Sequence, residues 1–265
     1  MTPTILTIAG SDSGGGAGIQ ADLKTASALG VYGASALTAV TAQNTSGVQS
    51  VLALAPEIVS AQIASVLDDI RVDAVKIGML ADARIIAAVA DALAGYDGPV
   101  VLDPVMVAKS GDSLLDEAAL STLLDRLVPR ADLLTPNLPE TARLLEAEVP
   151  ADPDAAADQG RALLDRGARA VLVKGGHGTG PRCTDILVTG AGDARFEAPR
   201  IATENTHGTG CAYSSAIASE LAKGATLADA VSRAHSWLHA AISASDRLGI
   251  GRGHGPVHHF HEVWR

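Results

Sequence analysis

Short apolar runs alternate with longer amphipathic segments along almost the whole chain. Runs rich in Val, Ile, Leu and Ala predict strands over residues 5–9, 36–42, 48–55, 74–78, 100–103, 133–135 and 170–174. Apolar residues at helical spacing predict helices over residues 18–29, from 56 onward, and over 82–94, 116–127, 139–146, 154–166, 209–223 and 227–248. Residues 186–189 and 194–198, separated by a Gly-rich turn, predict a hairpin.

This alternation of strand and helix predicts an α/β fold. Strands linked through helices form a mostly parallel sheet with helices on both faces, a three-layer α/β/α sandwich. We find no linker, repeat or low-complexity tract, so residues 1–265 are expected to form a single domain. Ligands of such sheets bind beyond the carboxyl ends of the strands. The residues that follow each strand are therefore the first candidates for function.

Composition narrows the class of protein. The chain is 47% hydrophobic and 19% charged, which is typical of a globular protein, and its net charge of −10 disfavours a nucleic-acid-binding surface. A mononucleotide remains a possible ligand, because backbone N–H groups, one lysine and a metal can hold its phosphates. With only Cys183 and Cys211, no signal-peptide pattern and no membrane-length apolar run, we expect a cytoplasmic protein without membrane contact.

The first predicted strand runs into a glycine-rich loop at residues 10–18. Such loops let the backbone approach a ligand closely. The loop is not a Walker A motif, because the chain contains no Gly-Lys pair. It is not a dinucleotide fingerprint either, since Ile19 stands where the third Gly or Ala is required, which disfavours an NAD-dependent dehydrogenase. The loop therefore predicts a binding role without naming the ligand.

Charged residues follow three of the later predicted strands. Asp103 precedes a proline and is either a turn residue or a carboxylate at the ligand crevice. Asn137 and Glu140 have the spacing of a helix capping box, and Glu140 could also face a hydrated Mg²⁺. Lys174 leaves a buried strand into a Gly-rich loop, a natural place for a phosphate contact.

The segment from Asn205 to Cys211 carries the strongest chemical signal. Its glycines lead directly into a predicted helix, whose free N–H groups form an anion site. Cys211 in the first turn is either a thiolate stabilised by the helix dipole or a small buried residue. The tail histidines, His258, His259 and His261, lack the ligand spacing of a metal site and are assigned to packing.

Together these motifs resemble the hydroxymethylpyrimidine/phosphomethylpyrimidine kinase family of the ribokinase-like superfamily. The matching stretches, in order and across nearly the whole chain, are AGSDSGGGAGIQADLKT (9–25), LTAVTAQNTSGV (37–48), KIGML (76–80), VVLDPVMVAKSGD (100–112), LLTPNLPE (133–140), VLVKGGH (171–177), NTHGTGC (205–211) and GPVHHFH (255–261). Each motif alone is common, but eight in sequence are specific.

The resemblance implies two successive ATP- and Mg²⁺-dependent phosphorylations in thiamine biosynthesis, of 4-amino-5-hydroxymethyl-2-methylpyrimidine and then of its monophosphate. The site residues that it implies fall into four groups: Gln43, Asp22, Gly10, Met79 and Val105 for the pyrimidine; Asn137, Lys174, Thr206, Gly208, Thr209 and Gly210 for the nucleotide; Asp103 and Glu140 for the metal; Cys211, Gly208, Gly210 and Lys174 for catalysis. Relatives are commonly dimers, so a homodimer is also implied.

Two alternatives stay open at this point. Vitamin B6 kinases share the fold and a cysteine at the position of Cys211, where most sugar kinases of the superfamily carry Asp, so a pyridoxal or pyridoxine kinase is the nearest rival. A non-catalytic pyrimidine-binding module is a rival from another class, disfavoured because Cys211 and Lys174 are both present. Residues 177–180 are the candidate lid, since glycines permit hinge motion.

Overall fold

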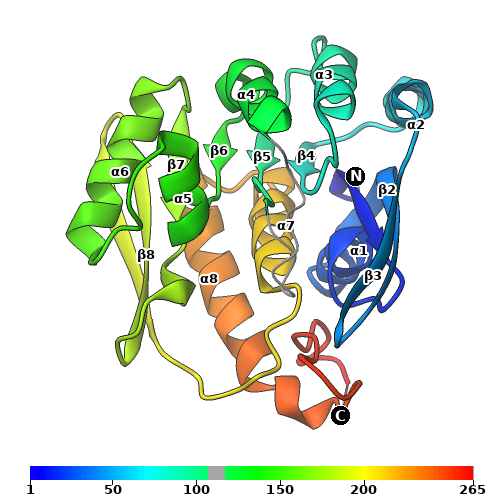
Figure 1. The fold of residues 1–265 in the computed structure, drawn as a ribbon. Coiled ribbons are helices and arrows are strands. Elements are labelled where there is room, and N and C mark those ends of the chain that lie inside the picture. Colours follow the sequence, from blue (N-terminus) through cyan, green and yellow to red (C-terminus); the bar gives the residue numbers. More distant parts are fainter. Residues whose placement is uncertain (107–116, 265) are drawn as a thin grey trace.

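Nine strands form one continuous sheet in residues 1–106 and 117–264, the parts of the chain that the computed structural model describes (Figure 1). They lie in the order β3-β2-β1-β4-β5-β6-β7-β8-β9. Their bounds are β1 Thr4–Asp12, β2 Tyr32–Asn44, β3 Gly47–Ala53, β4 Ala74–Ile77, β5 Val100–Leu102, β6 Leu133–Leu134, β7 Ala170–Val173, β8 Arg182–Thr189 and β9 Gly192–Pro199. Six neighbouring strands, β2, β1, β4, β5, β6 and β7, are parallel to one another. At the two edges, β3 pairs antiparallel with β2, β8 with β7, and β9 with β8.

Helices cover both faces of this sheet. One face carries α1 (Gly18–Ala28), α7 (Thr209–Ala222) and α8 (Leu227–Ser243), and the opposite face carries α2 (Pro56–Asp69), α3 (Ala83–Ala92), α4 (Glu117–Arg126), α5 (Leu138–Leu145) and α6 (Pro153–Asp165). Short 3-10 turns follow at η1 (Val128–Arg130), η2 (Gly175–His177) and η3 (Ser245–Arg247). The predicted three-layer α/β/α arrangement is confirmed.

Two apolar cores, one on each face of the sheet, hold the layers together. Successive side chains of a strand point to opposite faces, so neighbouring residues pack into different cores. In β1, Leu6 and Ile8 pack under α2 and α3, while Ile5 points to the face of α1 and α7. Buried parallel strands lie between two helical layers, so both faces must be apolar. This is why the sequence shows short continuous aliphatic runs here rather than alternation.

The predicted bounds agree with the observed ones to within a few residues at most elements and differ most in one strand and one helix. The strand predicted at 36–42 extends over Tyr32–Asn44, because small residues such as Gly33 begin it; a Cβ at Gly33 would lie 2.6 Å from the Leu23 side chain on α1. The helix predicted to reach residue 248 ends at Ser243, and the chain tightens into η3. The first residue of the helix predicted at 116–127 lies outside the described residues.

The hairpin predicted around residues 190–193 is confirmed as β8 and β9, paired from Arg182↔Pro199 to Thr189↔Gly192. No helix within the described ranges has both the length and the apolar character needed to cross a membrane.

Candidate active site

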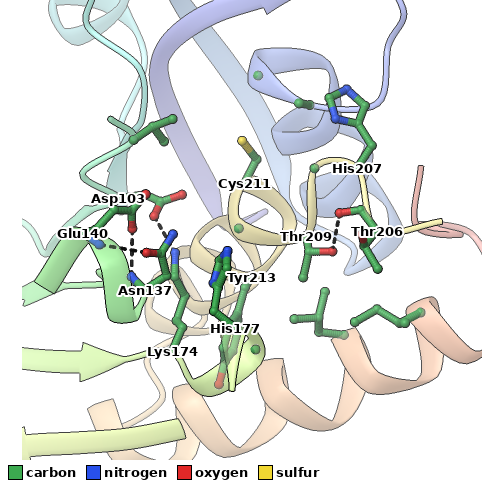
Figure 2. Close-up of a pocket in the computed structure, with 18 of the residues that line it drawn as sticks. Asp103, Asn137, Glu140, Lys174, His177, Thr206, His207, Thr209, Cys211 and Tyr213 are labelled. Atoms are coloured by element: carbon green, nitrogen blue, oxygen red, sulfur yellow. Dashed lines mark hydrogen bonds and ion pairs between the residues drawn. The ribbon is translucent and has the colours of Figure 1, made fainter. Parts of the chain in front are cut away.

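A cavity of about 880 Å³ opens at the carboxyl edge of the parallel strands, where the topology places a ligand. All but one of the predicted site residues line it: Gly10, Gln43, Met79, Asp103, Val105, Asn137, Glu140, Lys174, Thr206, Gly208, Thr209, Gly210 and Cys211. Figure 2 shows Cys211 between two groups, with Asp103, Asn137, Glu140 and Lys174 on one side and Thr206, His207 and Thr209 on the other.

The amino end of α7 forms one wall of the cavity. Gly208 caps this helix with a φ of 75°, and a Cβ there would lie 1.8 Å from the carbonyl oxygen of Gly16. Only glycine fits this position. A Cβ at Gly210 would lie 3.4 Å from both Asp103 Oδ2 and Lys174 Nζ, so the first turn directly faces these charged groups. The first N–H groups of a helix have no partner within it and can bind an anion.

Lys174 and Asp103 form a buried ion pair at the ends of β7 and β5. Lys174 Nζ lies 2.7 Å from Asp103 Oδ1, and the hydroxyls of Thr135 and Ser214 donate to the same carboxylate at 3.2 and 3.3 Å. Although burial disfavours the ammonium, the Asp103 charge holds the pKa of Lys174 above its usual value. The lysine is therefore a permanent cation in the cavity wall.

Asn137 and Glu140 form the predicted capping box at the start of α5. The Asn137 side chain accepts from the Glu140 N–H at 2.9 Å, and Glu140 Oε2 accepts from the Asn137 N–H at 2.7 Å. Burial raises the pKa of the Glu140 carboxyl to about 7, although the Lys174 charge opposes this shift. Capping explains one carboxylate oxygen, and the residue still lines the cavity.

Cys211 is partly exposed to the cavity, but its thiol is not acidic. Burial raises the pKa of Cys211 to about 11, and the opposing influence of the Lys76 ammonium and the Gly18 N–H does not overcome it. The sequence left open whether Cys211 is a thiolate stabilised by the helix dipole or a small buried residue. In the structure, removal of the thiol from water outweighs the position at a helix terminus.

Asp12 organises the glycine-rich loop, a role that sequence reasoning missed. Its carboxylate accepts from the N–H groups of Gly14, Gly16 and Ala17 at 2.8 to 3.0 Å, and lies 2.8 Å from His207 Nε2. The available signal was an Asp two residues before a glycine, the usual start of a turn bonded through its side chain. The loop is thus an ordered wall of the cavity.

His207 joins this loop to the α7 motif and to Gln43. Its Nε2 also lies 3.3 Å from Gln43 Nε2, while Thr41 donates to Gln43 Oε1 at 3.1 Å. His207 stands inside the NTHGTGC motif, yet sequence reasoning gave it no role, because its partners come from residues far away in the chain.

Asp22 departs from the expectation that it contacts the substrate. It is fully buried and does not belong to the described lining of the cavity. Lys76 Nζ holds both of its oxygens at 2.9 and 3.0 Å, and Thr7 and Ser215 donate to it as well. Its hydrogen-bonding capacity is used within the protein core.

The cavity continues between α7, α8 and the β8–β9 hairpin. This extension is lined by Tyr213, Asp185, His235, Arg200, Ile201, Leu238, His239 and Ile242, and by His177. Asp185 accepts from the Gly175 N–H at 2.8 Å, and burial raises its pKa. Apart from His177, which the sequence placed in the candidate lid, these residues come from separate elements and share no sequence motif, so sequence reasoning did not find them.

The histidines of the tail are packing residues. His258 and His259 are buried, and the rings of His258 and His261 lie against Trp264 and Trp237. Within the described ranges, no three His, Cys, Asp or Glu side chains gather as a metal-binding group.

A parallel sheet whose carboxyl edge carries an anion-binding helix terminus and a buried lysine is typical of small-molecule kinases. Solved structures agree with this class. The chain aligns with the pyridoxal kinase of Bacillus subtilis, solved with ADP, at a TM-score of 0.92 and 36% identity over all of both chains. It aligns with the phosphomethylpyrimidine kinase of Clostridium difficile at a TM-score of 0.80 and 42% identity, over 90% of this chain and 99% of that one.

Sequence comparison identifies the family. The phosphomethylpyrimidine kinase family matches residues 12–258. The hydroxymethylpyrimidine/phosphomethylpyrimidine kinase of Rhizobium meliloti is 56% identical over 265 residues, covering all of both chains. The chain belongs to the phosphomethylpyrimidine kinase family.

Proposed function

We infer that this chain phosphorylates 4-amino-5-hydroxymethyl-2-methylpyrimidine with ATP and then phosphorylates the monophosphate to the diphosphate, in thiamine biosynthesis. The observation that carries this function is the α7 terminus, which faces the Lys174–Asp103 pair across one cavity. Phosphoryl transfer needs alignment and neutralisation of negative charge, and this arrangement supplies both. The 56% identity to the Rhizobium meliloti kinase supports the same substrates.

The anion site would hold the transferred group. In this proposal the N–H groups of Gly208, Gly210 and Cys211 bind the phosphoryl oxygens, and Lys174 balances the charge of the β- and γ-phosphates. Thr206 and Thr209 on one side of Cys211 and Asn137 on the other, which all line the cavity, would contact the nucleotide phosphates. The extension of the cavity over α8 leaves room for the rest of the nucleotide.

Asp103 and Glu140 would hold Mg²⁺. A hydrated Mg²⁺ needs few carboxylates, and these two acids share one wall of the cavity with Lys174. Burial raises the pKa of the Glu140 carboxyl, and a cation bound beside it would favour its ionised form. When bound, the ion would neutralise phosphate charge that the protein alone leaves uncompensated.

The acceptor ring would lie in the part of the cavity lined by Gln43, Gly10, Met79 and Val105. Gln43 offers the ring both a donor and an acceptor, and Gly10, Met79 and Val105 provide a close apolar surface. A Cβ at Gly10 would lie 2.9 Å from the terminal methyl of Met79, so this part of the cavity is narrow. We assign no substrate contact to Asp22. Cys211 then accepts the proton of the hydroxymethyl group as its oxygen attacks phosphorus.

A side-by-side turnover assay with the hydroxymethylpyrimidine and with pyridoxal tests this function. We expect kcat/KM for the pyrimidine to exceed that for pyridoxal by at least about a hundredfold, the range over which a polar site rejects a mismatched ring. The high structural similarity to pyridoxal kinases makes this comparison the decisive one. Equal turnover of both alcohols would contradict the assignment of the pyrimidine as the preferred substrate, but it would still agree with phosphoryl transfer from ATP to an alcohol.

The same proposal places the kinase in the cytoplasm as a homodimer, with residues 1–265 acting as one kinase domain. Both cysteines are free thiols, as expected in a reducing compartment. Support for the dimer comes from the edge hairpin, where Val40 and Leu52 face each other across β2 and β3 with 42% and 66% of their surface exposed.

A further inference from the structure

The buried ion pair of Lys76 and Asp22 has no part in the function proposed above. Neither side chain reaches solvent, and the Asp22 carboxylate accepts from Lys76, Thr7 and Ser215. Removing two charges from water costs free energy, and a folded protein is often at least as stable when apolar residues of similar volume replace a buried ion pair. Packing alone therefore does not explain the pair.

The pair lies directly beneath the first turn of α7. Cys211 and Ser215 are four residues apart on α7, and Gly18 and Asp22 are four apart on α1, so each couple shares a helix face. The Gly18 N–H favours the thiolate of Cys211, and one turn deeper the Ser215 hydroxyl donates to Asp22 at 2.7 Å. These contacts form successive layers of the interface between α1 and α7, and the pair lies in the layer below that of the thiol.

The ammonium of Lys76 points toward the cavity end of β4. A Cβ at Gly78 would lie 2.7 Å from Lys76 Nζ, which places the nitrogen beside the carboxyl end of that strand. Lys76 and Gly78 are two residues apart and project from the same face of the sheet. The next residue, Met79, already lines the cavity.

Four charged groups act on Cys211 from the elements packed around it. Burial raises the pKa of its thiol, and the Lys76 ammonium opposes this more strongly than Asp22 or Asp103 reinforce it. The charge of Lys174 is also coupled to the thiol. Burial disfavours the Lys76 ammonium too, but Asp22 holds the pKa of Lys76 above its usual range. The cation therefore persists throughout the working pH range.

We propose that Lys76 is a positioning residue for phosphoryl transfer, whose ammonium, anchored by Asp22, supports the thiolate of Cys211 that takes the proton of the acceptor alcohol. This inference rests on the proposed role of Cys211 as base. In that step the O–H bond breaks and an S–H bond forms, while the oxygen bonds to the γ-phosphorus and ADP leaves with the electrons of the broken P–O bond. Asp22 acts in the site only through Lys76.

Thiol alkylation tests the inference without using turnover. The rate at which iodoacetamide modifies Cys211 is followed from pH 6 to 10, with each cysteine resolved by peptide mass spectrometry. We expect the double variant Lys76→Met/Asp22→Asn, which removes the cation that lowers the thiol pKa together with the weaker opposing anion, to slow the alkylation of Cys211 at pH 8 by about threefold, half a unit in thiol pKa. The Cys183 peptide in the same sample is the internal reference.

Thr7→Val is the matched control. It removes a hydrogen bond to Asp22 from the same network, keeps the side-chain shape, and leaves both charges in place. We expect its alkylation profile to match that of the unaltered protein. If Lys76→Met/Asp22→Asn does not fold, Lys76→Met/Asp22→Leu replaces the pair with apolar side chains and carries the same expectation. An unchanged profile in the folded double variant, or equal slowing in Thr7→Val, overturns the inference.

Kinetics separate this inference from the proposed function. In the double variant we expect kcat of the first phosphorylation to fall about threefold with the KM for ATP unchanged, because only proton acceptance is weakened. The second phosphorylation, which begins from a phosphate monoester that is largely ionised, should change little. If the unaltered enzyme did not turn over the pyrimidine, the proposed function would be wrong. The alkylation result would still test the inference about Lys76, because alkylation does not depend on turnover.

Discussion

At the scale of single residues, Cys211 combines an unfavourable pKa with a central position. Burial raises the pKa of its thiol to about 11, so at neutral pH only a small fraction is thiolate. A strong base present in a small fraction still accelerates a proton transfer, but its contribution depends steeply on pH. Below pH 11 the thiolate fraction rises about tenfold for each pH unit.

Replacing Cys211 by Ala should therefore separate the two reactions. We expect kcat of the first phosphorylation to fall about 10²–10³-fold, because the alcohol loses its base, and the second to fall less than about tenfold. The rise of the first rate between pH 7 and 9 should disappear in the variant. Rapid-quench measurement of each step gives both numbers, and equal losses in the two steps would leave Cys211 only a positional role.

Gln43 is the second residue whose role can be isolated. Gln43→Ala removes the paired donor and acceptor that we assign to the pyrimidine, which should raise the pyrimidine Kd about 10–100-fold, the effect of two lost hydrogen bonds. The Kd for ATP, measured by calorimetry, should stay within about twofold. Gln49→Ala, on the exposed edge strand β3, is the control. A pyrimidine Kd that does not change would remove Gln43 from the site.

At the scale of elements, the two ends of α7 differ: the amino end forms part of the proposed site, whereas the glycine at the carboxyl end is expected to affect only stability. Gly208 starts the helix and Gly224 follows it, and both have a positive φ, 75° and 85°. Their surroundings differ. A Cβ at Gly208 would collide with the Gly16 carbonyl, whereas a Cβ at Gly224 would meet no atom within 4 Å. The amino end thus packs against the glycine-rich loop, whereas a side chain added at Gly224 would meet open space.

Alanine at these two positions should have opposite consequences. We expect Gly208→Ala to reduce both phosphorylations by more than about a hundredfold, because the N–H groups of the anion site are displaced. Gly224→Ala should cost about 1 kcal/mol of unfolding free energy from strain at positive φ and leave kcat unchanged. Urea unfolding and steady-state kinetics on both variants measure the contrast. Normal turnover in a folded Gly208→Ala variant would contradict the anion-site assignment.

At the scale of the whole molecule, the two edge strands of the sheet differ in the residues that they expose. Antiparallel β8 and β9 close one edge, with a Pro at the end of β9. The other edge is β3, which is exposed along much of its length and carries Val51 and Leu52. An exposed apolar edge strand favours pairing with another chain. The proposed homodimer would cover it.

Leu52→Glu tests that dimer. A charge at a side chain with 66% exposure costs a monomer little, but it would be buried uncompensated in a dimer contact. We expect sedimentation to show a dimer for the unaltered chain and a monomer for the variant, with unchanged thermal stability at low concentration. Val149→Glu, 54% exposed and far from β3 in the chain, is the matched control. A monomer in the unaltered chain would exclude the proposal.

The sequence by itself determined the order of strands and helices and the edge of the sheet where ligands bind. Both follow from local physics: the aliphatic runs of β1, β4, β5 and β7 suit only strands buried on two faces, and parallel strands bring their carboxyl ends together. The capping box of Asn137 and Glu140 was equally readable, because its partners lie three residues apart.

Only the tertiary structure decided what distant residues do to one another. Asp22 looked like a substrate contact until Lys76, 54 residues further on, was found to hold it in the core. Asp12 and His207 meet across 195 residues, and the Cys211 thiol becomes less acidic because the surrounding layers exclude water. Charge and burial depend on three-dimensional neighbours, so a linear pattern can place such residues in a site but cannot set their ionisation or their partners.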